Sequence, residues 1–450
     1  MAVIMPASRL SRILKNFADN VLGKILGLEK HEYIAVAWSF AYFFCVLSSY
    51  YILRPVRETM AVGSGPDTIL WLFTGTFVVM LIVTPIFGWV ASRYPRRQFL
   101  PWVYLFFISN IIIFWGIFSF AIDREVDHIW LGRVFFVWLS VFNLFVVSVF
   151  WSFMADIYTR EQGRRLFGVI TAGGSIGALA GGGATRSLVT YIGFENLFPI
   201  AAALLMIAIL CITRLRSWIE QSSSQDVNTT VASAKPLGGN PFAGITHVFA
   251  SRYFTGIAIS LMIASLLGTA LYILMAQLVE PGIPNVDDRV KFFADVNNAT
   301  NALALIIQLL IVMRVVHRFG IGVSLSLMPI ASVIGFIVLA INPVLGVVTV
   351  FTVLRRALGF GFSKPTSDML YSVVTPEEKY KTKNFIDTAV YRSGDVIAAL
   401  ALKALAAIGL GMAAISMVML PFAALWASLS IWLGRDYRRQ AKRLKESGVT

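Results

Sequence analysis

The chain has 450 residues, of which 57% are hydrophobic and only 14% are charged, and its mean hydropathy is +0.75. A soluble domain of this size does not have that balance. Apolar runs recur from Tyr33 almost to Gly434, and many approach the ~20 residues that cross ~30 Å of hydrocarbon. Because the strands of a membrane barrel are about 10 residues long and alternate in polarity, the sequence predicts a polytopic helical membrane protein instead.

The formal net charge of +14 does not indicate a nucleic-acid-binding protein, because the Lys and Arg residues are spread through short loops and tails. Both cysteines, Cys45 and Cys211, lie in apolar runs, which indicates neither a disulfide framework nor a metal cluster. The four histidines are scattered without ligand spacing. We therefore expect no cofactor, no metal and no nucleic-acid partner.

Residues 1–32 mix apolar residues with Arg and Lys, as an interfacial amphipathic helix does. We interpret them as a cytoplasmic arm, because they lack the continuous apolar core of a signal peptide; a transit peptide is the alternative. Twelve apolar runs follow, six on each side of a polar stretch. They lie near residues 33–53, 68–91, 99–122, 129–155, 166–190, 196–213, 253–279, 292–313, 321–341, 344–363, 385–408 and 410–433.

The second six runs repeat the first at an offset of about 220 residues, so that Gly174-Ser175 corresponds to Gly394-Asp395. Parallel halves of this kind resemble the major facilitator superfamily, in which the substrate binds between the halves near the midplane. The predicted fold is all-α, with twelve transmembrane helices in two pseudo-symmetric six-helix bundles. Its units are an N-terminal bundle at 33–213, a linker at 214–252, a C-terminal bundle at 253–433 and a basic tail at 434–450.

Basic residues are distributed unequally between the two sides of the predicted bundle. With the N-terminus inside, the cytoplasmic loops and the tail from Arg435 to Lys445 carry most of the Lys and Arg. The opposite side holds few, and nearby acids partly offset them. The positive-inside rule therefore predicts that both termini are cytoplasmic, and we expect a bacterial inner membrane.

Charged residues within or near the apolar runs of 352–400 are the main functional signal. Arg355 lies about twelve residues, or roughly 18 Å, into its span, which puts it near the midplane. Arg392 enters from the other side to a depth of about 10 Å, and Lys364 lies between them in sequence. Such costly charges normally face a wet cavity or a partner, so we expect either an anion-binding pathway or buried salt bridges with Asp368 or Asp395.

Two further groups of polar residues fall in the predicted spans. Arg54 and Arg57 are three residues apart and share a helical face, where they either contact substrate or anchor the helix at the interface. Asn297 and Asn301 form a stripe that continues to Gln308, and they either line water or bond neighbouring helices. By contrast, the glycines of T171-A-G-G-S-I-G-A-L-A-G-G-G183 predict close helix packing rather than a phosphate loop.

Five motifs together resemble the nucleotide transporter family, the ATP/ADP translocases of plastids and intracellular bacteria. YYILRPVRE at 50–58 resembles the family's Tyr-xx-Leu-Arg-xx-Lys-Asp, with Arg57 in place of the Lys. DMLYSVVTPEEKYKTKNFID at 368–387 resembles its Glu-Met-x-Tyr and Lys-x-Lys-x-Lys-xx-Ile-Asp, which matches Lys379, Lys381, Lys383 and Asp387 to family residues. The other three are FWSFMADIYTREQGRRLFG at 150–168, with Glu161, Arg164 and Arg165 at matched positions, FFADVNNAT at 292–300 and RSGD at 392–395.

One departure concerns the cargo. The family has a Val-Glu-x-x-Trp-Lys segment in its seventh helix, whereas the corresponding run here is ALYILMAQ at 270–277, with neither the acid nor the Lys. The resemblance implies membership of the family, but it leaves the substrate open.

We therefore expect a monomeric secondary transporter, not an enzyme, that exchanges a small anionic, phosphorylated solute by alternating access among membrane lipids. The alternative is a proton-coupled porter of another organic anion, lipid or drug, using Asp368, Asp395 or Glu161 as proton carrier. The expected substrate-binding residues are Arg54, Arg57, Asn297, Asn301, Arg355, Lys364, Lys383 and Arg392. The expected gating or coupling residues are Asp156, Glu161, Arg164, Arg165, Asp368, Asp387 and Asp395.

Overall fold

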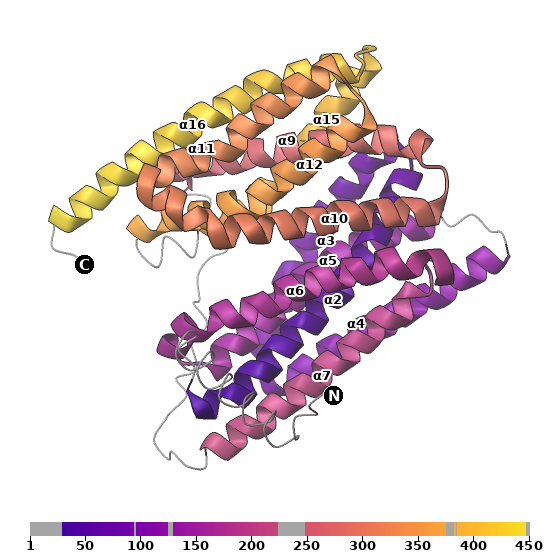
Figure 1. The fold of residues 1–450 in the computed structure, drawn as a ribbon, viewed down its shortest axis with the longest axis vertical. Helices are drawn as coiled ribbons and strands as arrows, with labels where there is room; N and C mark the ends of the chain where they lie inside the picture. Colours follow the sequence, from indigo (N-terminus) through magenta and orange to yellow (C-terminus); the bar gives the residue numbers. More distant parts are fainter. Residues whose placement is uncertain are drawn as a thin grey trace, which may run out of the picture.

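The computed structural model describes residues 29–93, 96–124, 129–223, 248–374, 382–383 and 385–446. The described chain is almost entirely helical, and the helices form two bundles, α2–α7 and α9–α16 (Figure 1). The α-helices are α2 (Tyr33–Gly63), α3 (Pro66–Arg93), α4 (Arg96–Asp123), α5 (Ile129–Ile157), α6 (Arg160–Ile192), α7 (Leu197–Ser223), α9 (Arg252–Gly282), α10 (Val286–Leu310), α11 (Val312–Ile341), α12 (Leu345–Leu358), α13 (Lys364–Leu370), α15 (Tyr391–Ala407) and α16 (Met412–Glu446).

Each predicted apolar run is helical over most of its described length. Among the described residues, ten helices are long and apolar enough to cross a membrane. α10 and α15 are the remaining two of the predicted twelve. α10 is more polar because five of its first ten residues are charged, and α15 has only 17 residues. Since α10 packs along α2, α6 and α12, it occupies the place of a spanning helix, as the twelve-helix fold requires.

Several helices continue past their predicted ends. α7 extends to Ser223 and α16 to Glu446, so the first part of the predicted linker and most of the tail are helical. The predicted loop between 313 and 321 is also largely helical, and α11 is kinked there at Gly320, whose φ of 81° favours glycine. Most of the predicted arm, residues 1–28, and most of the linker, residues 224–247, lie outside the described residues.

The N-terminal bundle is built around α2, which packs against α5, α6 and α7. The predicted glycine packing is confirmed on α6. A Cβ on Gly173, Gly177 or Gly181 would lie 2.4–2.6 Å from a backbone oxygen of α2, so the two backbones approach as closely as glycine permits. Elsewhere this half is filled by aromatic side chains, including Tyr42 and Phe150, whose ring centroids are 4.9 Å apart.

The C-terminal bundle has two interrupted helices that position the site. α12 passes into a π-helix, η3 (Gly359–Ser363), before α13, and α15 is preceded by a second π-helix, η5 (Ile386–Val390). Single π-helical turns inside α-helices are frequent at functional sites. The predicted span at 344–363 therefore continues through a wide turn to residue 370, and a short 3₁₀ turn, η4 (Tyr371–Val373), follows it.

The two halves meet through α10, which lies against α2 and α6, and through α3, which lies against α15. At one end of this seam, the backbone N–H of Phe194 donates to Asp287 at 3.2 Å. Arg186 of α6 also forms an ion pair with Asp295 of α10. These contacts hold the halves together near the α6–α7 and α9–α10 connections.

Candidate substrate site

A cavity of about 510 Å³ lies inside the C-terminal half, and residues of both π-helices, η3 and η5, form part of its lining. Its lining comes from α9, α11, α12, η3, α13, η4, η5, α15 and α16, and it includes Arg355, Lys364, Asp368, Tyr371, Asp387, Tyr391, Arg392 and Trp426. Three cations and two carboxylates therefore share the cavity with aromatic rings. Such a surface suits an anion that also has a flat apolar part.

Arg355 is 5% exposed and is held by main-chain and aromatic groups. Its Nη2 donates to the carbonyl oxygen of Ala264 at 2.5 Å, and its guanidinium lies 6.0 Å from the ring centroid of Trp426. Its Nε has no hydrogen-bond partner, and no carboxylate of the described residues lies within 4 Å of it. An unpaired buried charge is costly, so a guanidinium in this setting favours an anionic partner.

Gly268 makes room for that guanidinium. A Cβ on Gly268 would lie 2.9 Å from Nη1 of Arg355, so a larger residue would displace the side chain. The glycine thus lets α9 pass directly behind the cation.

Asp395 is buried and forms a separate ion pair with Arg392, whose side chain is partly exposed. Nη1 of Arg392 donates to Oδ2 of Asp395 at 3.2 Å, and the carboxylate also accepts bonds from Ser265 and, at 2.8 Å, from Thr269. Ser265 and Thr269 are four residues apart on α9, so both hydroxyls lie on one face. Of the two predicted salt bridges, Arg392 with Asp395 is present, and Arg355 takes part in neither.

Lys364, which lines the cavity, and Lys383, which is not part of its lining, belong to one chain of ion pairs. Nζ of Lys364 lies 2.9 Å from Oδ2 of Asp387 and 3.7 Å from Oδ1 of Asp368. Nζ of Lys383 lies 2.6 Å from the same Asp368 oxygen. The chain links α13 to the start of η5, across the gap between the two interrupted helices. Lys379 and Lys381, which the family resemblance singled out, lie outside the described residues.

Arg54 and Arg57 do not line this cavity. Nε of Arg54 lies 3.6 Å from Glu58, one turn along α2, and its Nη1 donates to Tyr51 at 3.2 Å. The guanidinium of Arg57 instead stacks 4.2 Å from the ring centroid of Phe136. Although the two arginines are three residues apart, their guanidiniums therefore have different partners.

The predicted asparagine stripe lies at the seam between the halves. The Tyr51 hydroxyl of α2 donates to Oδ1 of Asn301 at 3.2 Å, so Asn301 bonds across the halves, and Asn297 is 1% exposed. Several buried polar atoms of the inner helices α2, α10 and α12 have no partner among the described residues. They include the Ser49 hydroxyl, Nε of Arg57, Nδ2 of Asn297, Nδ2 of Asn301, the Thr352 hydroxyl and Nε of Arg355.

One face of α9 connects the seam to the cavity. Ala264 and Gly268 contact Arg355, and Tyr272, one turn further, lies beside Glu58 and Arg57 of α2. Four residues correspond to about 6 Å along a helix. The arginines of the two halves thus approach the same helix about a turn apart, but the described cavity contains only those of the C-terminal half. Gly268, Tyr272 and Trp426 were missed from the sequence. The i, i+4 spacing on α9 signals the first two, whereas Trp426, on α16, has no such signal.

Of the expected gating residues of the N-terminal half, Arg165 holds two helices of that half together. Nη2 of Arg165 lies 2.9 Å from Glu32 and 3.4 Å from Glu29, so the start of α6 is tied to the start of α2. Gln162 also donates to Glu32, at 3.0 Å. Glu161 is exposed in the first turn of α6, Asp156 is exposed near the end of α5, and the side chain of Arg164 lies outside the described residues.

Comparison with known proteins defines the class. The Major Facilitator Superfamily profile matches residues 38–399, and the chain belongs to that superfamily. A bacterial homologue of the iron transporter ferroportin in its inward-facing state superposes with a TM-score of 0.61 at 14% identity, covering 90% of this chain and 99% of that one. A peptide transporter of the POT family gives a TM-score of 0.57 at 13% identity, covering 90% and 96%. The protein is therefore a membrane transporter by fold.

Within that class, the sequence is similar to ADP,ATP carriers, as the motifs predicted. ADP,ATP carrier protein 1 of Chlamydia trachomatis serovar D is 22% identical over 451 aligned residues, which cover 84% of each chain. ADP,ATP carrier protein 2 of Chlamydia pneumoniae is 20% identical and covers 92% of this chain and 91% of that carrier.

Proposed function

We propose that the protein is an alternating-access exchanger of an anionic, phosphorylated solute, with a nucleotide such as ATP or ADP as the favoured cargo. The observation that carries the proposal is Arg355, a buried guanidinium without a carboxylate partner among the described residues, in a cavity that also offers Lys364 and Arg392. A guanidinium donates two parallel hydrogen bonds to phosphate oxygens. The similarity to ADP,ATP carriers supports a nucleotide.

The aromatic rings of the cavity supply the second part of the binding site. Tyr371, Tyr391 and Trp426 line it together with Arg355, so a planar base has stacking surfaces close to the cation that binds its phosphates. Residues 270–277 of α9 lack the acid and Lys of the family pattern, and most of them are buried packing residues. We therefore assign recognition of the base to the aromatic rings of the cavity rather than to that segment.

We attribute exchange to the ion pairs of the cavity. Lys364 is held by Asp387 and Asp368 in the structure, and an incoming phosphate competes with these carboxylates for the lysine. The phosphate frees the carboxylates of Asp387 and Asp368, so these ion pairs and the adjacent π-helices differ between the substrate-free and substrate-bound states. A ligand shifts a conformational equilibrium only through such a difference in interaction.

We also propose that the described conformation is open to the cytoplasm, with both termini there. The contacts of Phe194 with Asp287 and of Arg186 with Asp295 close the seam at the end that is external in this orientation. Tyr371, Asp387 and Leu433, near the opposite ends of their helices, line the cavity. The basic end of α16 lies on that same side, as the positive-inside rule requires.

Counterflow in proteoliposomes tests the proposal. Vesicles preloaded with nucleotides, sugar phosphates or carboxylates are given labelled ATP, and we expect uptake only with an internal nucleotide or related phosphate. Uptake that is insensitive to the internal anion would contradict exchange.

The rival, a proton-coupled porter, is favoured by one observation. Asp395 is 4% exposed, as a proton carrier in a membrane is, and it is bound to Arg392, Ser265 and Thr269. The same vesicles separate the two functions, because an uncoupler would collapse proton-driven uptake and would leave one-for-one exchange running.

A further inference from the structure

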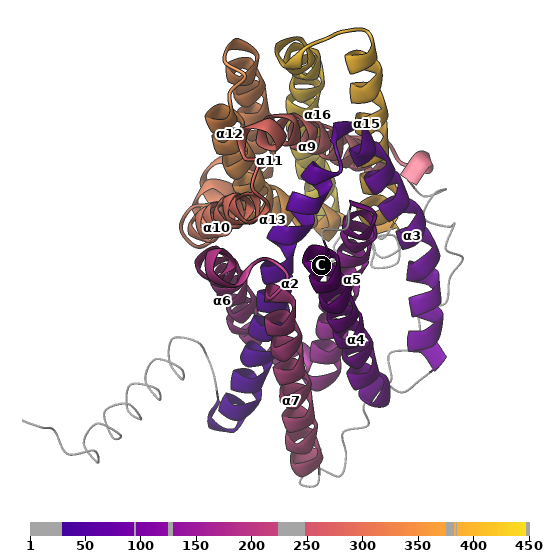
Figure 2. The same ribbon diagram turned by 90° about the vertical axis from the view of Figure 1, so that its right-hand side faces the viewer.

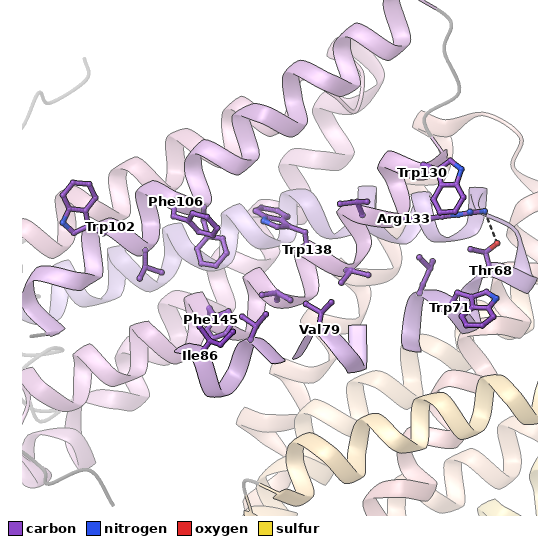
Figure 3. Close-up of a pocket in the computed structure, with 17 residues that line it drawn as sticks. Thr68, Trp71, Val79, Ile86, Trp102, Phe106, Trp130, Arg133, Trp138 and Phe145 are labelled. Carbon is purple, nitrogen blue, oxygen red and sulfur yellow. Dashed lines mark hydrogen bonds between the residues drawn. The ribbon is translucent and has the colours of Figure 1, made fainter. Parts of the chain in front are cut away.

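A larger cavity, of about 1220 Å³, lies in the N-terminal half and is separate from the proposed substrate site (Figure 3). Residues of α3, α4 and α5 line it, and we call it the α3–α4 groove. It exists because α3 packs against α5 and α15 while α4 packs against α5 and α7, so that α3 diverges from α4 (Figure 2). Apart from Thr68 and Arg133, its lining side chains are aliphatic or aromatic.

The groove has the length of the hydrocarbon layer. On α3 its lining runs from Thr68 to Ile86, a separation of about 27 Å at 1.5 Å per residue, against ~30 Å for the layer. Tryptophans stand at both ends, Trp71 and Trp130 at one and Trp102 at the other (Figure 3), and they are 66–73% exposed. Tryptophans at both membrane interfaces are typical of lipid-facing surfaces. The groove therefore opens to lipid along its length.

Arg133 gives one end of the groove a charge. Its Nη2 donates to the Thr68 hydroxyl at 3.2 Å, and its guanidinium stacks 4.3 Å from the ring centroid of Trp130. Its buried Nε has no hydrogen-bond partner among the described residues. A guanidinium fixed at the level of the interfacial tryptophans matches a lipid phosphate in position, charge and geometry.

We propose that the α3–α4 groove is a binding site for one anionic phospholipid of the outer leaflet. The phosphate binds Arg133, and one acyl chain descends between α3 and α4. An apolar chain is required there, because an empty groove leaves its lining side chains without contacts on one side and water gains no hydrogen bonds from them. The assignment to the outer leaflet uses the orientation proposed above; the site itself is independent of the transported solute.

The bound lipid also affects the conformational equilibrium. α3 contacts α15 of the other half as well as α5, so the position of α3 depends on how the two halves are arranged. A lipid chain that holds α3 apart from α4 stabilises the arrangement described here over any in which α3 closes on α4.

Lipid titration of the purified, delipidated protein tests the site. Phosphatidylglycerol and phosphatidylcholine with identical acyl chains are added, and bound lipids are counted by native mass spectrometry. We expect one phosphatidylglycerol to bind at least about tenfold more tightly than phosphatidylcholine, and Arg133→Gln to remove that preference, as expected for the loss of hydrogen bonds to a charged group. Arg124→Gln is the matched control, because Arg124 stacks on Phe120 outside the groove.

A second variant tests the groove without changing its charge. Val79→Trp fills the middle of the groove, away from Arg133 at its end (Figure 3), and we expect it to weaken the binding of both lipids while Arg133 remains in place. Elution volume and thermal transition verify that each variant is folded. Unchanged phosphatidylglycerol binding in folded Arg133→Gln, or unchanged binding of both lipids in folded Val79→Trp, would overturn the proposal, as would a wild-type protein without preference.

Discussion

Arg355 differs from Arg392, its neighbour in the cavity, in what neutralises it. Arg392 is paired with Asp395, whereas Arg355 is held by the Ala264 carbonyl and the Trp426 ring. Breaking a buried ion pair leaves the other charge without compensation, while removing an unpaired buried charge does not. The two arginines therefore have opposite energetic roles within one cavity.

This difference predicts opposite effects on stability. Arg392→Met should lower the free energy of unfolding by roughly 3–5 kcal/mol, because it strands Asp395. Arg355→Met should leave it unchanged or raise it, although it removes the proposed anion site. Thermal unfolding of both variants in the same detergent measures this. Equal losses in the two variants would show that Arg355 has a carboxylate partner after all.

Glu195, in the α6–α7 connection, predicts a pH dependence. Burial raises its pKa above the ordinary value, and the nearby Asp287 and Asp123 raise the pKa further. The unfolded-state pKa is about 4.3, and a higher folded-state pKa means that the folded protein binds the proton more tightly. Stability therefore falls as pH rises from the unfolded-state pKa to the folded-state pKa. In Glu195→Gln, the part of the pH dependence of stability that Glu195 contributes should disappear. The check is the thermal transition of both proteins from pH 4 to pH 7.5; identical slopes would rule the assignment out.

At the scale of elements, α2 and α6 show how small residues position the inner helices. Gly177 approaches the backbone of Phe44 so closely that a Cβ would lie 2.4 Å from its oxygen, whereas a Cβ on Gly183 meets nothing within 4 Å. The two glycines lie on the same helix less than two turns apart.

Substitution by valine should therefore separate them. Gly177→Val forces α6 away from α2 and should cost at least about 1–3 kcal/mol, as overpacking does. Gly183→Val is the control, and its effect on stability should be only a few tenths of the effect of Gly177→Val. Thermal unfolding and yield of folded protein are the measurements, and similar behaviour of the two variants would contradict the packing described here.

The π-helices η3 and η5 are the elements that give the cavity its shape. They place Lys364 and Asp387 within 2.9 Å of each other although the residues are 23 positions apart. A wide turn has one more residue than an α-helical turn, so each helix can change register locally without unfolding. We therefore regard these turns as the places where α12 and α15 respond to substrate.

At the scale of the whole molecule, the two halves are joined at the proposed external end by Arg186 and Asp295. Arg186→Asp places two acids together and should weaken the closed external end, lowering the exchange rate. The double variant Arg186→Asp with Asp295→Arg restores an ion pair and should recover much of the rate. Exchange in proteoliposomes measures both proteins; a double variant no better than the single one would show that the pair does not close this end.

Much of the architecture was predictable, because the length of an apolar run determines whether a helix crosses the bilayer, and the internal repeat indicated two halves. That Arg355 faces a cavity was predictable from its charge within an apolar run, and it does line one. Its partners were not, since its contact with Ala264 depends on how α9 passes behind it at Gly268. Neither π-helix nor the divergence of α3 from α4 has a local sequence signal, because both depend on packing between distant segments.

Equilibrium binding of labelled ATP to the purified protein, wild-type and Arg355→Gln, tests the central claim most directly. We predict saturable binding to the wild type and binding to folded Arg355→Gln that is weaker by about tenfold or more, which corresponds to the loss of charge-assisted hydrogen bonds to phosphate. Equal affinity of the two folded proteins for ATP would contradict the assignment of Arg355 as the residue that binds the transported anion.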